Sequence, residues 1–330
     1  MKTTKIQNRS TKNDEVIAAL PLACSDEKAA VEFMEQQRWG AHPACPQCGD
    51  MNVYQMMDSK EPTNRQANYR WRCRGCKAQY SVRTGTVYEE SRISLKHWCF
   101  AFWRASTSKK GVSALEIHRQ TGLSYKSSLF LLHRIRYAMA DMPAMQMGGS
   151  GKIVEADETY FGTETGKPKK QRGRRGGAAH NAMNKIVALV ERGGGVRSFH
   201  VADVRGENLK AVLMAQIDKE SHVMTDSSPR YNLVKREKPF ANYDQINHSK
   251  GEYVRGEVTT NHVEGYFNIL KRGLHGIYHN VSSHHLHRYL SEFDFRYTNR
   301  YLDDGERTTL AIRMANGKRL MYKEPVKKAN

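Results

Sequence analysis

Four cysteines in two close pairs are the strongest chemical signal in the sequence. Cys45 and Cys48 form one C-x-x-C pair, and Cys73 and Cys76 form a second. The two-residue spacing lets a tight turn point both sulfurs of a pair at one ion, and two pairs supply the four thiolates of a structural Zn²⁺ site. A redox motif would need only one pair, and disulfides do not persist in a reducing cytosol. We therefore predict one Zn²⁺ bound by all four sulfurs.

Three carboxylates are the candidates for a second, catalytic metal site. Asp157 lies within an expected strand, Asp226 ends another, and Glu264 lies in the first turns of an expected helix. A helix laid across the ends of adjacent strands could bring the three together, and such a cluster would bind two hard divalent cations through oxygen. Two such ions can activate an attacking oxygen and stabilise a leaving one. Taken alone, each acid is better explained as a surface acid or one half of an ion pair.

Other acids lie close enough in sequence to compete for these roles. Side chains alternate along a strand, so Glu155 shares the face of Asp157 and Glu158 points the other way. We interpret both glutamates as supporting or structural. Glu257 is an alternative to Glu264, but it precedes the helix in a stretch with little to hold it still, and metal ligands need rigid positions. The sequence therefore favours Glu264.

The composition points to a polyanionic partner. The 330 residues include 53 Lys and Arg against 34 Asp and Glu, a formal net charge of +19, which favours nucleic acid. No apolar run approaches the roughly 20 residues of a membrane span. The N-terminus is basic but lacks the apolar segment of a secretory signal. We expect a cytoplasmic, nucleoid-associated protein with double-stranded DNA, and no membrane, as its partner.

The elements that must carry the cysteines are small. Residues 26–38 are expected to form an amphipathic helix capped by Asp26 or Ser25. Residues 69–72 and 80–83 alternate aromatic and basic side chains as strands do, which is typical of the β-hairpins of a zinc ribbon. These side chains could contact a phosphate backbone, or the aromatic ones could cover the metal core.

A helical segment follows the cysteines, with apolar residues at helical spacing from Ser94 onward. Residues 112–121 and 125–139 are expected to form two helices joined by a turn at Gly122 and capped by Ser124. This is the pattern of a helix-turn-helix, which would place the start of the second helix in a DNA groove. An ordinary helical hairpin is the alternative.

Basic side chains provide the candidate DNA contacts. The run 167–175 is flanked by glycines between two expected strands, so we interpret it as a loop that attaches to phosphates without reading sequence. Residues 133–136 are expected on a solvated or phosphate-touching face. Solvated surface is the alternative for the run and for the helix flank beside Glu264. The predicted DNA-binding residues are Lys126, Lys167, Lys169, Lys170, Arg172, Arg174, Arg175, Lys271 and Arg272.

The second half of the chain alternates strands and helices. Strands are expected at 152–161, 185–191, 196–204 and 222–226, and helices at 206–219 and 260–272. Three strands linked by hairpins, then a helix, a strand and a helix, suggest an α/β domain of ribonuclease H-like type, with a mixed sheet flanked by helices. The expected divisions are an N-terminal helical segment (1–40), the zinc ribbon (41–90), the helix-turn-helix segment (91–141), a linker (142–151), the catalytic domain (152–302) and a basic tail (303–330).

Several stretches resemble the motifs of a known family. They are residues 154–160, 225–226, 247–254, 260–279 and 285–297, together with Arg38-Trp39 ahead of the first cysteine pair. They resemble the DDE-type insertion-sequence transposases that have an N-terminal zinc ribbon and an ISXO-like catalytic domain. The resemblance spans about residues 25–301. It implies a ribonuclease H-like domain using Mg²⁺ or Mn²⁺, with Asp157, Asp226 and Glu264 as the acidic triad. Residues 227–229 depart from the family pattern, which could alter how the substrate is positioned without removing a ligand.

The resemblance implies a DNA transposase that binds insertion-sequence ends, cleaves phosphodiesters and joins the 3′-OH ends to target DNA by a two-metal mechanism. Asp157 would bridge both ions, with Asp226 and Glu264 holding one each. We expect a homo-oligomer on DNA. One alternative is a sequence-specific DNA-binding regulator with an inert catalytic half, which would show no metal-dependent cleavage. Another is a ribonuclease H-like nuclease that cuts without joining.

Overall fold

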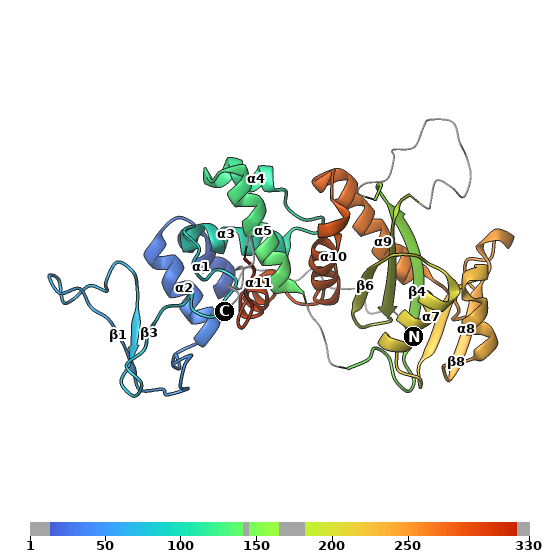
Figure 1. Cartoon of the computed structure of the whole chain (residues 1–330), viewed down its shortest axis with the longest axis horizontal. Helices are drawn as coiled ribbons and strands as arrows, with labels where there is room; N and C mark the ends of the chain where they lie inside the picture. Colours follow the sequence, from blue (N-terminus) through green and yellow to red (C-terminus); the bar gives the residue numbers. More distant parts are fainter. Residues whose placement is uncertain (1–13, 141–144, 165–181, 322–330) are drawn as a thin grey trace, which may run out of the picture. The chain divides into compact units, whose positions relative to one another are not determined.

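The computed structural model describes residues 14–140, 145–164 and 182–321 (Figure 1). The chain divides into two compact units, one formed by residues 1–140 with 301–330 and the other by residues 141–300. The segment 303–330, expected as a basic tail, contains a helix, α11 (Asp304–Arg313), that packs within the first unit. Within the described ranges, none of the helices has both the length and the apolar character needed to cross a bilayer.

The first unit is built around packed helices. They are α1 (Glu15–Ala23), α2 (Glu27–Trp39), α3 (Leu95–Thr107), α4 (Ala114–Thr121), α5 (Tyr125–Met139) and α11. α3 packs against α2, α5 and α11, and its expected apolar face is buried, with Trp98 and Phe102 fully enclosed. A buried hydrogen bond between Ser106 Oγ and Thr308 Oγ1 (3.0 Å) joins α3 to α11. As expected, the Asp26 side chain caps the first turn of α2.

The turn between α4 and α5 follows the sequence pattern closely. Gly122 has a φ of 74°. This left-handed conformation commonly ends a helix, and glycine adopts it with the least strain. Ser124 Oγ accepts the N–H of Ser127 (3.1 Å) and caps α5. The imidazole of His118 forms a hydrogen bond with the carbonyl oxygen of Leu123, which closes the turn. The two helices and the turn between them are therefore present where they were expected.

One expectation for α5 is wrong. Residues 133–136 were expected on a solvated or phosphate-touching face, but His133 and Arg136 are buried. The guanidinium of Arg134 donates to the carbonyl oxygen of Leu320 (2.9 Å). α5 packs against α3, α4 and α11, and this packing encloses His133 and Arg136, whereas the first turn of α5 stays exposed.

A small three-stranded antiparallel sheet carries the second cysteine pair. Its strands, in the order β1-β2-β3, are β1 (Val53–Gln55), β2 (Trp71–Cys73) and β3 (Gln79–Tyr80). The rings of Trp71 and Tyr80 meet the ring of Trp39 edge-on and cover the cysteines, so these aromatic side chains serve the core. Glu35 on α2 accepts two hydrogen bonds from the guanidinium of Arg65 (2.9 and 2.8 Å) and one from the indole of Trp71 (2.7 Å). These contacts fix the ribbon to α2.

The second unit contains a five-stranded mixed sheet. Its strands are β4 (Ile153–Phe161), β5 (Asn184–Glu191), β6 (Val196–Val201), β7 (His222–Asp226) and β8 (Asn242–Ile246), in the order β6-β5-β4-β7-β8. β4, β5 and β6 pair antiparallel, whereas β7 and β8 run parallel to β4. The four expected strands are confirmed. β8 was not expected, because three of its five residues, Asn242, Asp244 and Gln245, are polar or charged and no apolar run marks it.

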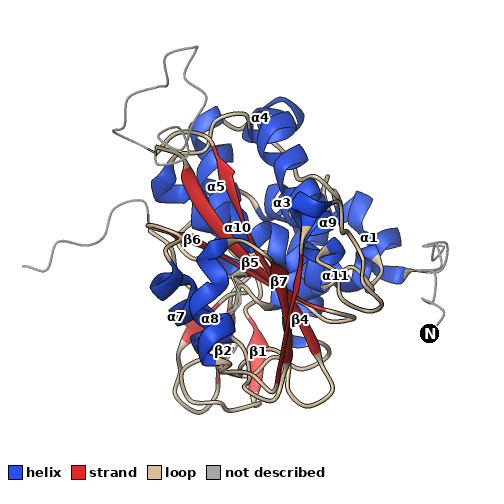
Figure 2. Cartoon of the chain, turned by 90° about the vertical axis from the view of Figure 1, so that its right-hand side faces the viewer, coloured by secondary structure: helices blue, strands red, loops and turns tan. Residues whose placement is uncertain are grey.

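Helices cover both faces of this sheet, as the blue helices and red strands of Figure 2 show. α7 (Gly206–Gln216) and α8 (Asn232–Glu237) pack on one face against Val154 and Leu189. α9 (Asn261–Gly273) and α10 (Ser283–Thr298) pack on the other face against Ile186 and Val190. Short 3₁₀ turns occupy Pro229–Tyr231 and His248–Lys250, and a π turn, Leu274–Tyr278, follows α9. The unit is thus a mixed α/β domain, as the sequence predicted at this level.

Candidate functional site

Asp157 and Asp226 lie on adjacent parallel strands. β4 and β7 pair in register as far as Glu155 and Met224, and each aspartate follows two residues later. Because side chains alternate along a strand, each aspartate shares the face of the residue two before it. Arg192 contacts both strands on this face, donating from Nε to Glu155 Oε1 (2.7 Å) and from Nη2 to the sulfur of Met224 (3.2 Å). The two aspartates therefore point to the same side of the sheet.

α9 contributes the third carboxylate on that side. Asp157 pairs across β5 with Ala188, and Ala188 belongs to the apolar cluster that α9 covers. Val263 and Phe267 are buried in this cluster, which sets the rotation of the helix about its axis. Glu264 follows Val263 in the first turn, and its side chain is 43% exposed. Packing of α9 thus directs Glu264 along the edge of the interface.

The surroundings of these acids disfavour their charged forms. Burial raises the pKa of Asp157 to about 8, and nearby negative charges contribute. Those charges belong to Glu158, Asp226 and Glu264. Burial also raises the pKa of Asp226, although the N–H of Ser228 opposes this by donating to its carboxylate. A bound cation would offset the negative charges that surround Asp157.

Glu264 is held by two neighbours. His248 Nε2 lies 3.2 Å from Glu264 Oε1 and 3.0 Å from Thr260 Oγ1. Thr260 Oγ1 in turn donates to Glu264 Oε1 (3.1 Å). The competing acid, Glu257, has an exposed side chain, and its backbone carbonyl accepts a hydrogen bond from Arg192 (2.8 Å). Of the two, Glu264 is among the charges that raise the pKa of Asp157.

Glu155 is fully buried and caps α9. Its carboxylate accepts the backbone N–H groups of His262 (2.8 Å) and Val263 (3.2 Å), which are free donors at a helix N-terminus. It also accepts hydrogen bonds from Nδ1 of His262 (2.8 Å) and from Nε of Arg192 (2.7 Å). The strand that carries Asp157 is thereby fastened to the helix that carries Glu264. This role fits the supporting function that the sequence suggested.

Glu158 points to the opposite face of the sheet, as expected. It accepts hydrogen bonds from the guanidinium of Arg230 and from the hydroxyl of Tyr231 (2.8 Å). The N–H of Ser228 donates to Asp226 Oδ1 (3.1 Å). The segment that departs from the family pattern therefore helps to orient Asp226.

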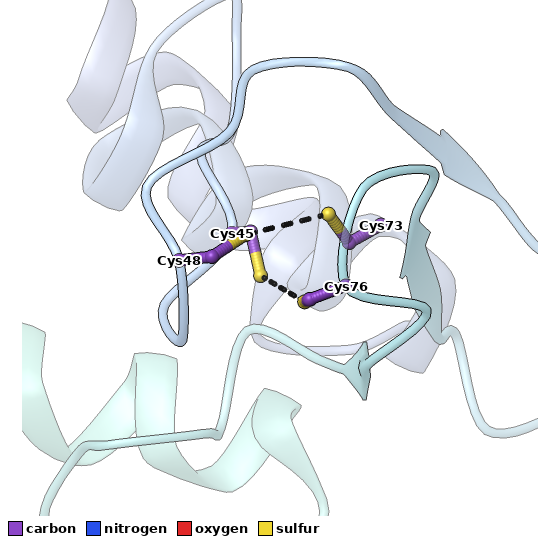
Figure 3. A group of neighbouring side chains, drawn as sticks. All are labelled: Cys45, Cys48, Cys73 and Cys76. Atoms are coloured by element: carbon purple, nitrogen blue, oxygen red, sulfur yellow. Dashed lines mark hydrogen bonds between the residues drawn. The ribbon is translucent and has the colours of Figure 1, made fainter.

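The four cysteines form the second site (Figure 3). Cys45 Sγ lies 3.6 Å from Cys76 Sγ, and Cys48 Sγ lies 3.7 Å from Cys73 Sγ. Four sulfurs placed tetrahedrally about Zn²⁺ at about 2.3 Å are roughly 3.8 Å apart. Among the described residues, these four alone form a group of three or more possible ligands with all ligand atoms within 4.8 Å of one another. The thiolates therefore fit Zn²⁺, whereas the carboxylates are more widely spaced.

The predicted DNA contacts are only partly described. Lys126 is exposed at the start of α5, and Lys271 and Arg272 are exposed near the end of α9. The six basic residues of the run 167–175 lie outside the described residues, so their placement stays a prediction.

Sequence reasoning missed His248 as a neighbour of the site. His248 lies in a stretch quoted for its family resemblance, but no acid or helix pattern marks the residue itself. Arg192 was also missed, because the turn after β5 gave no sign that it returns to Glu155. Both contacts depend on how distant segments fold together, which spacing along the chain does not show.

Comparison with known proteins finds relatives of both parts of the chain. Residues 25–79 match the family described as transposase zinc-ribbon domain, and residues 148–298 match the ISXO2-like transposase domain. A protein of Halobacterium salinarum described as an uncharacterized protein in transposable element ISH50 is 28% identical over 280 residues. That similarity covers 82% of this chain and 90% of the relative.

Among solved structures, the chain matches one from the simian T-cell lymphotropic virus intasome in complex with PP2A regulatory subunit B56 gamma. The TM-score is 0.28 at 15% identity, over 57% of this chain and 66% of that one. A similarity this weak supports no conclusion about fold or function. The two domain matches and the relative in a transposable element agree with each other: the chain belongs to the insertion-sequence transposases that combine a zinc ribbon with an ISXO2-like transposase domain.

Proposed function

We propose that this protein is a DDE-type DNA transposase that cleaves the ends of its element and joins the freed 3′-OH groups to target DNA. The observation that carries the proposal is the convergence of Asp157, Asp226 and Glu264 on one side of the sheet. The raised pKa of Asp157 supports it, because the charges of the other two acids contribute to that shift. The preference for Glu264 over the exposed Glu257 rests on the same coupling.

A ribonuclease H-like fold for the second unit is supported by its topology. Three strands linked as hairpins, β4 to β6, are followed by α7 and then by β7, which is parallel to β4. This succession is the one from which the sequence suggested that fold. Two of the three proposed catalytic acids lie on the central strand β4 and at the end of its parallel neighbour β7, where α/β sheets commonly place ligand groups.

The donor set fits two divalent cations, Mg²⁺ or Mn²⁺. Asp157, Asp226 and Glu264 would hold them, because hard cations favour carboxylate oxygens. Such ions stabilise the attacking and leaving oxygens of an in-line displacement at phosphorus. The chain's own residues fix the acids: the N–H of Ser228 holds Asp226, and Thr260 holds Glu264. No covalent intermediate with a Ser or Tyr side chain is required.

DNA binding is assigned to the first unit and to basic side chains of both units. The zinc ribbon and the α4–α5 helices would recognise the element ends, with Lys126 at the exposed start of α5. Lys271, Arg272 and the run 167–175 would bind phosphates without reading sequence. We propose that the protein acts on double-stranded DNA as a homo-oligomer and resides with the nucleoid.

The test uses a labelled duplex with the element's own end sequence, a target plasmid, and Mg²⁺ or Mn²⁺. Wild-type protein should nick the duplex and join its 3′-OH to the plasmid. Glu264→Gln, which keeps the shape and removes the charge, should abolish both reactions while end binding stays near normal. Glu257→Gln is the matched control and should retain activity.

Each alternative predicts a different result in this assay. A regulator with an inert catalytic half would bind the ends without cutting them, and a nuclease would give nicks without joined products. If the Glu257 variant were dead and the Glu264 variant active, the assignment of the third acid would be wrong.

A further inference from the structure

Two adjacent apolar side chains are exposed on the segment that connects β8 to α9. Tyr253 is 63% exposed and Val254 is 56% exposed. Lys250 and Arg255, on either side of them, are exposed as well. The segment thus presents an aromatic ring and a branched aliphatic side chain, with Glu252 next to the ring and a basic residue on either side.

The connecting segment is held in a fixed conformation. The N–H of Asn247 donates to Glu252 Oε2 (3.1 Å), and the N–H of Glu252 donates to the carbonyl oxygen of Asn247 (3.1 Å). The Arg255 guanidinium donates to the carbonyl oxygen of Gln245 (3.0 Å) and lies 3.5 Å from a carboxylate oxygen of Asp244. Because both ends of the turn are tied, the exposed side chains are presented at low entropic cost to a ligand.

Tyr253 lies close to the catalytic acids. Its ring centroid is 5.4 Å from that of His248, and His248 Nε2 is 3.2 Å from Glu264 Oε1. One imidazole therefore separates the tyrosine ring from a proposed metal ligand. The tyrosine ring therefore lies within about three nucleotide spacings of this acid, at roughly 3.4 Å per nucleotide along a strand.

We infer that Tyr253 stacks on an unpaired base beside the cleaved phosphodiester, with Val254 packed against the same nucleotide. The inference rests on the proposed function, because it takes DNA as the substrate of this site. The exposed charge of Lys250 fits a phosphate of a strand, whereas Arg255 pairs with Asp244 and Glu252 and holds the turn. An aromatic ring is suited to the face of a base, and apolar side chains inserted at a base step unstack it. Unstacking frees the adjacent phosphate to reach Asp157 and Asp226, which are partly buried.

The inference is tested with two forms of the element-end duplex, one fully paired and one mismatched next to the cleavage point. Tyr253→Ala should nick the paired duplex about 10- to 100-fold more slowly than wild type, as expected for loss of one stacking contact. Tyr253→Phe keeps the ring and should stay within a few-fold of wild type. The mismatched duplex should restore Tyr253→Ala, because its base is already unpaired.

A binding measurement without catalysis separates this inference from the proposed function. 2-Aminopurine placed next to the cleavage point should change fluorescence with wild type in the absence of divalent metal, and not with Tyr253→Ala. Tyr301→Ala, at another exposed tyrosine, is the matched control and should behave as wild type. If wild type neither cuts nor joins DNA, the proposed function fails, and the fluorescence comparison still decides the role of the ring.

Two results would overturn the inference. One is a Tyr253→Ala variant that nicks paired DNA as fast as wild type. The other is a slow variant that the mismatch fails to restore and that gives the wild-type fluorescence change, because the ring would then act on something other than base pairing.

Discussion

Two acids on one face of β4 have opposite electrostatic environments. Although burial opposes it, hydrogen bonds from His262 and Arg192 lower the pKa of Glu155. Two residues later, burial raises the pKa of Asp157 to about 8, and the charges of neighbouring acids contribute. Acids whose environments push their pKa values apart usually have different tasks. Glu155 already has its partners, whereas Asp157 has the environment expected of a residue that receives a cation.

Asp294 on α10 gives the clearest pH dependence. It accepts the N–H and hydroxyl of Ser198 (2.9 and 2.8 Å) and the hydroxyl of Tyr266 (2.6 Å), yet burial raises its pKa to about 7. At a pH between about 4, the pKa of an unfolded aspartate, and about 7, folding therefore takes up a proton. The free energy of unfolding falls as the pH rises through this window. Asp294→Asn, which cannot ionise, should be more stable than wild type at pH 8 by on the order of 2 kcal/mol.

Urea unfolding of both proteins at pH 5 and pH 8 checks this prediction. The stability difference between Asp294→Asn and wild type should grow with pH. An equal difference at both pH values would show that Asp294 ionises as easily in the folded chain as in the unfolded one.

At the scale of elements, the cap of α9 is the critical contact. Replacing Glu155 by Gln puts an NH₂ group where only acceptors fit, opposite the N–H groups of His262 and Val263. We expect a loss of about 2–4 kcal/mol, since a buried ion pair is broken. Because α9 also carries Glu264, the Mg²⁺ concentration for half-maximal cleavage should rise several-fold. Glu155 is thus predicted to be a positioning residue.

The control for this prediction is another buried glutamate paired with an arginine. Glu292 on α10 forms an ion pair with Arg296 and is 1% exposed, as buried as Glu155. Glu292→Gln should also lose stability, but it should leave the Mg²⁺ requirement unchanged. If both variants shifted the requirement equally, the effect would come from general destabilisation.

Elements with a strong local pattern were predictable from the sequence, and elements defined by distant contacts were not. β5 contains a continuous apolar run, and β4 and β7 contain shorter apolar stretches. The turn at Gly122 is marked by a glycine followed by a capping serine. β8 is mostly polar, and it forms a strand by pairing in parallel with the edge of β7. The carboxylates were predictable because they end or interrupt such patterns. Arg192 contacts Glu155, from which it is 37 residues away in the sequence, and no local pattern indicates such a contact.

For the whole molecule, the charge of +19 predicts DNA binding that weakens steeply with salt. Replacing Lys169, Lys170, Arg172 and Arg174 by Gln should reduce the slope of log K against log [salt] by up to about 0.9 per lost phosphate contact. Discrimination between element-end and random DNA should stay largely intact, since phosphate contacts carry no sequence information. Titrations at several salt concentrations measure both quantities. A collapse of discrimination would mean that this run reads bases.

The division of the chain into two units makes zinc a local requirement. The ribbon has a core of only a few residues around its cysteines, so metal binding must supply much of its folding free energy. The α/β unit has two larger apolar clusters of its own. Cys73→Ser should therefore lose zinc and end binding while the thermal transition of the α/β unit remains.

Elemental analysis and calorimetry test this separation. Purified wild type should contain about one zinc per chain, as a tetrahedral four-thiolate site requires. Cys99→Ser is the control, because Cys99 is equally buried but lies on α3, outside the four-sulfur group, and this variant should keep its zinc. A Cys73→Ser protein with full zinc and full end binding would contradict the assignment. Loss of both thermal transitions together would instead show that the ribbon supports the fold of the whole chain.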